Sequence, residues 1–189
     1  MTTNFDLRTF SIKPSPSITE FLGGLSCAPE KFDRRLFNTD LLAILDVEEI
    51  DKTAIICQSM GGWTGLQTAV YHPERGSCLA LSITPGGIKI PTVAAALTEL
   101  SRVFAERGLG TAAVADGFTQ EILETAFLYR QIGLFNINLP VDLSNRNPAE
   151  IHPDEMDGYC VATLMITSEH YQKFTPNLIR EVSKHIPDS

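Results

Sequence analysis

The fold of this 189-residue chain is decided by one stretch, Thr53-Ala-Ile-Ile-Cys57-Gln-Ser59-Met-Gly-Gly62-Trp-Thr-Gly-Leu-Gln-Thr-Ala-Val-Tyr71-His-Pro-Glu-Arg75. The β-branched run from Thr53 to Cys57 predicts a buried strand, and Gly61 to Tyr71 predicts a helix that is stopped by Pro73. The sharp turn between them displays Ser59 at the tip of the strand. There the hydroxyl can attack a carbonyl carbon, and the developing oxyanion can meet backbone N–H groups at the start of the helix.

The flanking sequence continues this alternation of strand and helix. The expected elements are a helix over 33–46, a strand over 78–82, helices over 93–107 and 119–132, a strand over 163–167 and a final helix from 175 to about 185. Thr175 is the expected N-cap of the final helix, and Pro176 is its expected first residue. This succession predicts an α/β fold with a mainly parallel sheet and crossover helices.

Composition and charge restrict the class of protein. A hydrophobic content of 43% and a charged content of 20% are typical of a soluble globular domain. The formal net charge of −8 argues against nucleic-acid and anionic-membrane partners, which select basic surfaces. No apolar run approaches the about 20 residues of a membrane span, and residues 1–6 lack the features of a signal peptide. We therefore expect a cytoplasmic protein with neither a nucleic-acid nor a membrane partner.

The four cysteines are Cys27, Cys57, Cys78 and Cys160. None of them forms a C-x-x-C pair, and two lie in apolar runs that predict strands. We expect buried, reduced thiols that act as small hydrophobic side chains, and neither a zinc site nor a disulfide framework.

Further motifs stand in a specific order along the chain. They are Asp6-Leu-Arg-Thr-Phe10, Asp40-Leu-Leu-Ala-Ile-Leu45, Cys57-Gln-Ser59-Met-Gly61-Gly62, His72-Pro-Glu-Arg75 and Leu164-Met-Ile-Thr-Ser168-Glu169-His170. Together they resemble the α/β-hydrolase family, in its branch of small esterases, lactonases and C–C hydrolases with a helical cap. The resemblance covers most of the chain from about residue 32. It implies an incomplete α/β-hydrolase fold, with a core of residues 1–90 and 158–189 and a helical cap insertion over 91–157.

The same resemblance implies roles for four residues. Ser59 lies at the nucleophile elbow, which normally reads G-x-S-M-G-G, and the Met60 N–H would be one oxyanion donor. A second interpretation is that Ser59 merely caps the helix. Tyr171 stands where the G-E-x-D turn carries the catalytic aspartate, and a neutral phenol cannot balance an imidazolium. Glu169 is either a substitute acid or a solvated turn carboxylate.

Other parts of the family's machinery have no counterpart in this sequence. No strand with an H-G dipeptide, which carries the second oxyanion donor, precedes Ser59. Ile83 and Thr84 occupy the end of the preceding strand, where some relatives place the acid. The family's histidine lies beyond a further strand, whereas the present sequence stops at Ser189. The four histidines present, which the motifs do not place at that position, are His72, His152, His170 and His185.

Two hypotheses about function follow from these observations. The first is a serine hydrolase for a small ester, lactone or related carbonyl compound, without metal or organic cofactor and impaired because acid and histidine are missing. The second is a catalytically inactive remnant or a non-catalytic binding domain of the same fold. In both cases the missing strands would expose sheet edges and apolar faces, which predicts either aggregation or a homo-oligomer that pairs those edges.

Overall fold

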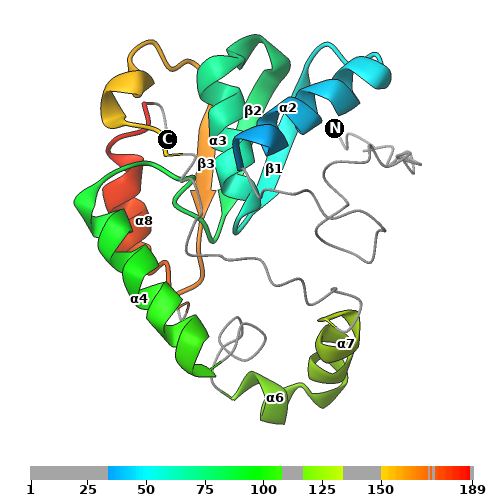
Figure 1. Cartoon of the computed structure of the whole chain (residues 1–189), viewed down its shortest axis with the longest axis vertical. Coiled ribbons are helices and arrows are strands. Elements are labelled where there is room, and N and C mark those ends of the chain that lie inside the picture. Colours follow the sequence, from blue (N-terminus) through cyan, green and yellow to red (C-terminus); the bar gives the residue numbers. More distant parts are fainter. Residues whose placement is uncertain (1–33, 108–116, 134–149, 170, 172, 188–189) are drawn as a thin grey trace, which may run out of the picture.

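The computed structural model of the chain describes residues 34–107, 117–133, 150–169, 171 and 173–187. The elements are α2 (Arg34–Val47), β1 (Thr53–Gln58), α3 (Gly61–Tyr71), η1 (Pro73–Arg75), β2 (Gly76–Ser82), α4 (Pro91–Arg107), α6 (Phe118–Glu121), α7 (Leu123–Gly133), η3 (Pro153–Met156), β3 (Thr163–Ile166) and α8 (Pro176–Ser183) (Figure 1). The expected order of strands and helices is confirmed. Residue 33 of the helix expected over 33–46, Cys27 and the motif at 6–10 lie outside the described residues.

The described strands form one parallel sheet in the order β1-β2-β3. On one face the register forms the rows Ile55–Leu79–Thr163 and Cys57–Leu81–Met165, and on the other face the rows Ile56–Ala80–Leu164 and Gln58–Ser82–Ile166. We call this second face the open face, because Ile56 is 82% exposed and Leu164 is 59% exposed there. The buried strand expected over residues 53–57 is therefore buried on one face alone, and β2 shows the same pattern. Among the described residues, the helices that pack on the sheet cover the first face.

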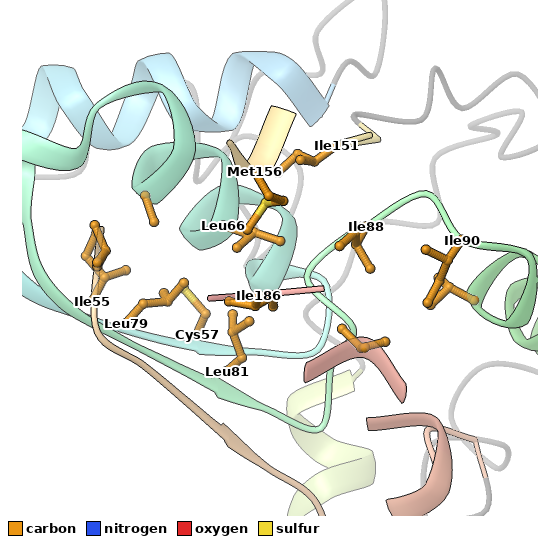
Figure 2. Packing of buried hydrophobic residues seen from close by; sticks show 14 residues of the cluster. Ile55, Cys57, Leu66, Leu79, Leu81, Ile88, Ile90, Ile151, Met156 and Ile186 are labelled. Carbon is orange, nitrogen blue, oxygen red and sulfur yellow. The ribbon is translucent and has the colours of Figure 1, made fainter. Parts of the chain in front are cut away.

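The hydrophobic core lies between the covered face of the sheet and α3. Leu79 and Leu81 of β2 and Leu66 of α3 are at most 1% exposed. Figure 2 shows the strand side chains directed towards Leu66, with Met156 and Ile186 joining the same cluster. The core thus gathers residues from segments far apart in the sequence, as a domain of this size requires.

A second connection brings the segment after β2 together with the segment around residue 150. Ile88 and Ile151 form an isolated parallel bridge, and both side chains are at most 1% exposed. The Ile151 N–H donates to the Gly87 carbonyl at 3.1 Å, and the Lys89 N–H donates to the Ile151 carbonyl at 2.7 Å. Residues 150–156 therefore pack on the core.

The helix boundaries follow local chemistry. The Thr175 hydroxyl accepts a hydrogen bond from the Leu178 N–H at 3.3 Å, so the expected cap and the Pro176 start of α8 are confirmed. α8 ends at Ser183, two residues before the expected end. The single helix expected over 119–132 is wrong, because Ile122 leaves helical geometry (φ −131°, ψ 66°) and separates α6 from α7.

The cysteines divide between the two environments of the sheet. Cys57 is buried on the covered face, whereas Cys78 and Cys160 are exposed, and all three are free thiols. The expectation of buried thiols is therefore wrong for Cys78 and Cys160. Cys78 is exposed although it lies within β2, and Cys160 lies outside the regular elements, before β3.

The His-Pro-Glu-Arg motif has a structural explanation in Arg75. Its guanidinium lies 2.8 Å from a carboxylate oxygen of Asp46 at the end of α2. The same group donates to the carbonyls of Ile50 and Asp51 at 3.0 Å and 2.9 Å. Arg75 thereby joins η1 to the connection between α2 and β1 through these bonds.

Within the described ranges, no helix has the length and apolar character needed to cross a membrane.

α3 approaches β1 most closely at Gly65. A Cβ atom at this position would lie 2.4 Å from Cys57 Sγ and 2.9 Å from Leu79 Cδ1. Gly61, one turn earlier, has more room, because its Cβ would lie 3.9 Å from Cys57 Cβ. The absence of a side chain at 65 thus sets the distance between helix and sheet.

We expect Gly65→Ala to lower the free energy of unfolding by about 1–3 kcal/mol, because the methyl group overpacks a buried contact. Urea denaturation measures the change. Gly61→Ala is the matched control and should leave stability within about 0.5 kcal/mol of the parent. Equal effects of the two substitutions would show that the close approach at 65 is not limiting.

Candidate active site

Ser59 lies in the turn between β1 and α3 with a left-handed backbone, φ 50°. This conformation is uncommon for a residue other than glycine and marks a tight turn. The Ser59 N–H donates to the Ser82 carbonyl at the end of β2 at 3.1 Å, and the Ser59 carbonyl accepts from the Gly62 N–H at 3.0 Å. These two bonds hold the turn, and the residue itself is exposed. The sequence thus places Ser59 correctly at a strand-to-helix corner.

Met60 follows as the N-cap residue of α3, with φ −59° and ψ −29°. No side chain caps the helix, so the interpretation of Ser59 as a cap is wrong. Within the described residues the Met60 N–H has no hydrogen-bond acceptor. A free N–H at the positive end of a helix, next to an exposed hydroxyl, can stabilise a developing negative charge.

The first turn of α3 is shaped by Thr84, which follows β2. Thr84 is 0% exposed, and a Cβ atom at Gly62 would lie 2.3 Å from its Oγ1. Gly86 and Gly87 have φ of 69° and 82°. Both glycines lie close to side chains of α3. At Gly87 a Cβ atom would lie 2.4 Å from the Trp63 ring. The turn after β2 therefore packs against the start of α3, the helix that follows Ser59.

Ile83 is the second left-handed residue at this edge of the sheet, with φ 48°. Its N–H donates to the Ile166 carbonyl of β3 at 2.7 Å. For a β-branched residue the left-handed conformation costs about 1–2 kcal/mol. The sequence carries no carboxylate at positions 83 and 84.

Tyr171 lies after β3, in a turn closed by a hydrogen bond from its N–H to the Ser168 carbonyl at 3.1 Å. Its ring is tilted against Phe174 with centroids 6.2 Å apart. Burial raises the pKa of the Tyr171 phenol, and the nearby Tyr129 of α7 raises it further. The phenol is therefore neutral at physiological pH and packs as part of an aromatic contact.

Glu169 is exposed in the same turn. This exposure agrees with the interpretation of Glu169 as a solvated turn carboxylate. Tyr171, in contrast, is half-buried. The structure gives Glu169 no contact with Ser59, and within the described residues the Ser59 hydroxyl has no hydrogen-bond partner.

The described histidines lie at the ends of other elements. His72 is the C-cap of α3, as expected, and so lies at the opposite end of that helix from Ser59. His152 precedes η3, where its N–H donates to Glu155 at 2.7 Å. His185 follows α8, and its N–H donates to the Val182 carbonyl at 2.9 Å. His170 lies outside the described residues.

The helices after β2 carry exposed apolar side chains. Leu123, Phe127 and Leu128 of α7 are 70%, 65% and 57% exposed. An electrostatic interaction between Tyr129 and Tyr171 links this segment to the turn after β3. In the part of the chain that the structure describes, no three His, Cys, Asp or Glu side chains gather in a group able to hold a metal ion.

No family model matches this chain, and no curated protein matches it by sequence. Solved structures do match it. A hydrolase from Pseudomonas aeruginosa superposes with a TM-score of 0.69 at 16% identity, over 89% of this chain and 66% of its own length. The enol-lactonase from Burkholderia xenovorans gives 0.59 at 23% identity, over 88% and 66%. A meta-cleavage product hydrolase from Pseudomonas fluorescens gives 0.59 at 16% identity, again over 88% and 66%.

The chain therefore has an α/β-hydrolase fold, and the expected fold class is confirmed. It spans 66% of the length of each of these three structures. At identities of 16% to 23% the similarity concerns the fold, and the roles of single residues have to be argued from this chain's own geometry.

The sequence interpretation missed two parts of the site. Thr84 was read only as the end of a strand, although a threonine followed by Pro-Gly-Gly indicates a tight buried turn. The electrostatic interaction of Tyr129 with Tyr171 joins residues 42 positions apart (171 − 129), and no local pattern predicts it.

The strand below Ser59 carries a titratable group whose ionisation opposes folding. Burial raises the pKa of the Cys57 thiol to about 11, while a hydrogen bond from the Gly65 backbone lowers it. In the unfolded chain this thiol has an ordinary pKa near 8.5–9. When the pH is below this ordinary pKa, the thiol is protonated in both states and its contribution to the free energy of unfolding is complete. At higher pH the unfolded chain loses the proton first, so the free energy of unfolding falls.

We therefore expect the free energy of unfolding to fall by about 1 kcal/mol between pH 8 and pH 10 through Cys57. Urea denaturation at several pH values measures the slope. Cys57→Ala should be less stable overall because a buried atom is lost, but its stability should be flatter over this interval. A slope that is unchanged in Cys57→Ala would assign the effect to other groups.

Proposed function

We propose that Ser59 is the nucleophile of a serine hydrolase that acts on a small ester, a lactone or a related carbonyl compound. The observation that carries this proposal is the conformation of Ser59, an exposed serine at φ 50° between a strand and a helix. Such a strained, exposed corner with a free N–H beside it is the geometry of a nucleophile elbow. The names of the matched structures, among them an enol-lactonase, agree with a small-molecule substrate.

The proposed reaction has two steps. Ser59 Oγ attacks the carbonyl carbon, the Met60 N–H hydrogen-bonds the oxyanion, and the C–O bond to the leaving alcohol breaks as that oxygen takes up the serine proton. Water then attacks the acyl-enzyme, releases the acid and restores the hydroxyl. Both steps need a base, and no described side chain contacts Ser59 Oγ. We therefore infer that turnover by this chain is impaired.

The second candidate is a non-catalytic domain of the same fold. It is favoured by Tyr171, whose neutral phenol stands where the resemblance places the acid. The division into a core of residues 1–90 and 158–189 and a cap of residues 91–157 remains part of both proposals. In either case Ser59 and Met60 would face a bound carbonyl group.

Fluorophosphonate labelling distinguishes the two candidates, because it requires a reactive serine hydroxyl but no complete turnover. We expect Ser59 to be labelled, with a rate about 10²–10³-fold below that of a site with two oxyanion donors. Ser59→Ala should abolish the labelling. Ser168→Ala removes another exposed serine and should leave it unchanged.

Mass spectrometry of the labelled protein identifies the modified peptide. Folded protein in which Ser59 stays unmodified at high reagent concentration would contradict the hydrolase proposal and support the non-catalytic domain. Equal labelling of Ser59 and Ser168 would indicate reagent chemistry rather than an activated site.

We also infer that copies of this chain associate through the sheet. Ile56 and Leu164 are exposed on the open face, and Ala80 lies between them in the same row. Within the described residues, β1 and β3 each have one edge without a partner strand. Unpaired edges beside an exposed apolar surface promote pairing with another chain.

Sedimentation at micromolar concentrations should therefore show a dimer or larger species. Ile56→Lys combined with Leu164→Lys should shift the distribution to monomer, because burying two ammonium groups is unfavourable. Val47→Lys is the control, since Val47 is 79% exposed at the end of α2. A parent protein that sediments as a monomer would contradict the inference.

A further inference from the structure

The turn after β2 and the turn after β1 are built as a pair. Gln58 and Ser82 face each other in the register of the sheet, and the residue after each of them is left-handed, at φ 50° for Ser59 and 48° for Ile83. Backbone strain of this kind persists only where the surrounding structure enforces it. The reversal at Ile83 is what directs the next residue, Thr84, under the first turn of α3.

Thr84 contacts the part of α3 that holds Ser59. Its Oγ1 would lie 2.3 Å, and its Cγ2 2.5 Å, from a Cβ at Gly62, so both branches of the side chain touch this glycine. Gly62 in turn donates its N–H to the Ser59 carbonyl at 3.0 Å. One van der Waals contact and one hydrogen bond therefore connect Thr84 to the serine.

The Thr84 side chain is itself fixed. Its Oγ1 accepts a hydrogen bond from the Gly86 N–H at 3.2 Å, and neither Thr84 nor Pro85 has appreciable exposure. A valine would have nearly the same shape but would leave the Gly86 N–H without this acceptor in a buried place. A serine would keep the acceptor and lose only a methyl group.

We propose that Thr84 is a positioning residue, whose buried hydroxyl holds the turn after β2 against Gly62 and thereby aims the Ser59 side chain at the start of α3. Thr84 is fully buried and so does not touch a substrate. The consequence for catalysis rests on the proposed function, whereas the geometric statement does not. The test can therefore use a readout at position 59 that needs no catalytic base.

Ser59→Cys supplies that readout. A thiol at the start of a helix ionises below the ordinary value of about 8.5. The pH dependence of iodoacetamide alkylation, read by tandem mass spectrometry at position 59, gives its pKa and separates it from Cys57. We expect a lowered pKa in Ser59→Cys itself. A pKa of about 8.5 in Ser59→Cys without further substitution would overturn the proposal, because the side chain would then not face the start of the helix.

In this background, Thr84→Val should raise the pKa at position 59 by about half a unit or more towards the ordinary value. Thr84→Ser should keep the lowered pKa, because it retains the acceptor for Gly86. Thr68→Val is the matched control, since Thr68 is also 0% exposed on α3 and accepts a hydrogen bond from Asn38 at 2.7 Å. It should lower stability without moving the pKa at position 59.

An unchanged pKa in Thr84→Val, or an equal rise in Thr68→Val, would overturn the proposal. If Thr84→Val does not fold, native hydrogen exchange of the unmodified protein decides the question. The amides of Gly86 and Ser59 should then show protection factors within about tenfold of each other, since one opening frees both. A larger difference would contradict the coupling. A pKa pattern as expected, combined with a Ser59 that fluorophosphonate does not label, would remove the proposed function and leave the positioning role intact.

Discussion

The close contact of α3 with the ends of β1 and β2 is the constraint on which the rest of the structure depends. Gly62 and Gly65 lie on the helix where side chains would collide with Thr84 and Cys57. Because the helix can approach so closely, Leu66 reaches the centre of the sheet and the core closes around it. Because helix and strand lie so close, the turn between them is tight. Ser59 adopts a left-handed backbone in this turn and is exposed to solvent. Packing and presentation of the hydroxyl therefore have one cause.

The sequence was sufficient for those parts of the fold that depend on local chemistry. β-branched residues followed by glycines predicted β1 and α3, and Thr175 with Pro176 predicted the start of α8. The burial of the strands could not be predicted in the same way. Ile56 has the composition of a core residue, and only the arrangement of the helices determines that its face is open. The break at Ile122 was not predictable from local sequence either, because no proline or glycine stands within residues 118–132 to mark it.

For the candidate site, the sequence located what lies within one motif and missed what joins distant segments. Ser59 and Met60 follow from a strand-turn-helix pattern. Thr84 lies 25 residues from Ser59 (84 − 59) and is brought to it by the parallel pairing of β1 with β2. Tyr171 was recognised as a departure from the family turn, but its packing against Phe174 required coordinates. Long-range contacts of this kind are set by sheet register, which no single motif encodes.

The site combines a well-formed corner with a hydroxyl that has no hydrogen-bond partner among the described residues, and this combination has a physical consequence. The strain at Ser59 and Ile83 and the buried turn at Thr84 are stabilised by packing and by hydrogen bonds within the sheet and its turns, so they do not require an acid or a base to persist. Proton transfer, in contrast, depends on groups that must touch Ser59 Oγ, and Tyr171 is held in an aromatic contact instead. A chain can therefore retain the geometry of a nucleophile while its reactivity falls. Under the proposed function, the shape of the elbow and the rate of the chemistry would therefore be set by different residues.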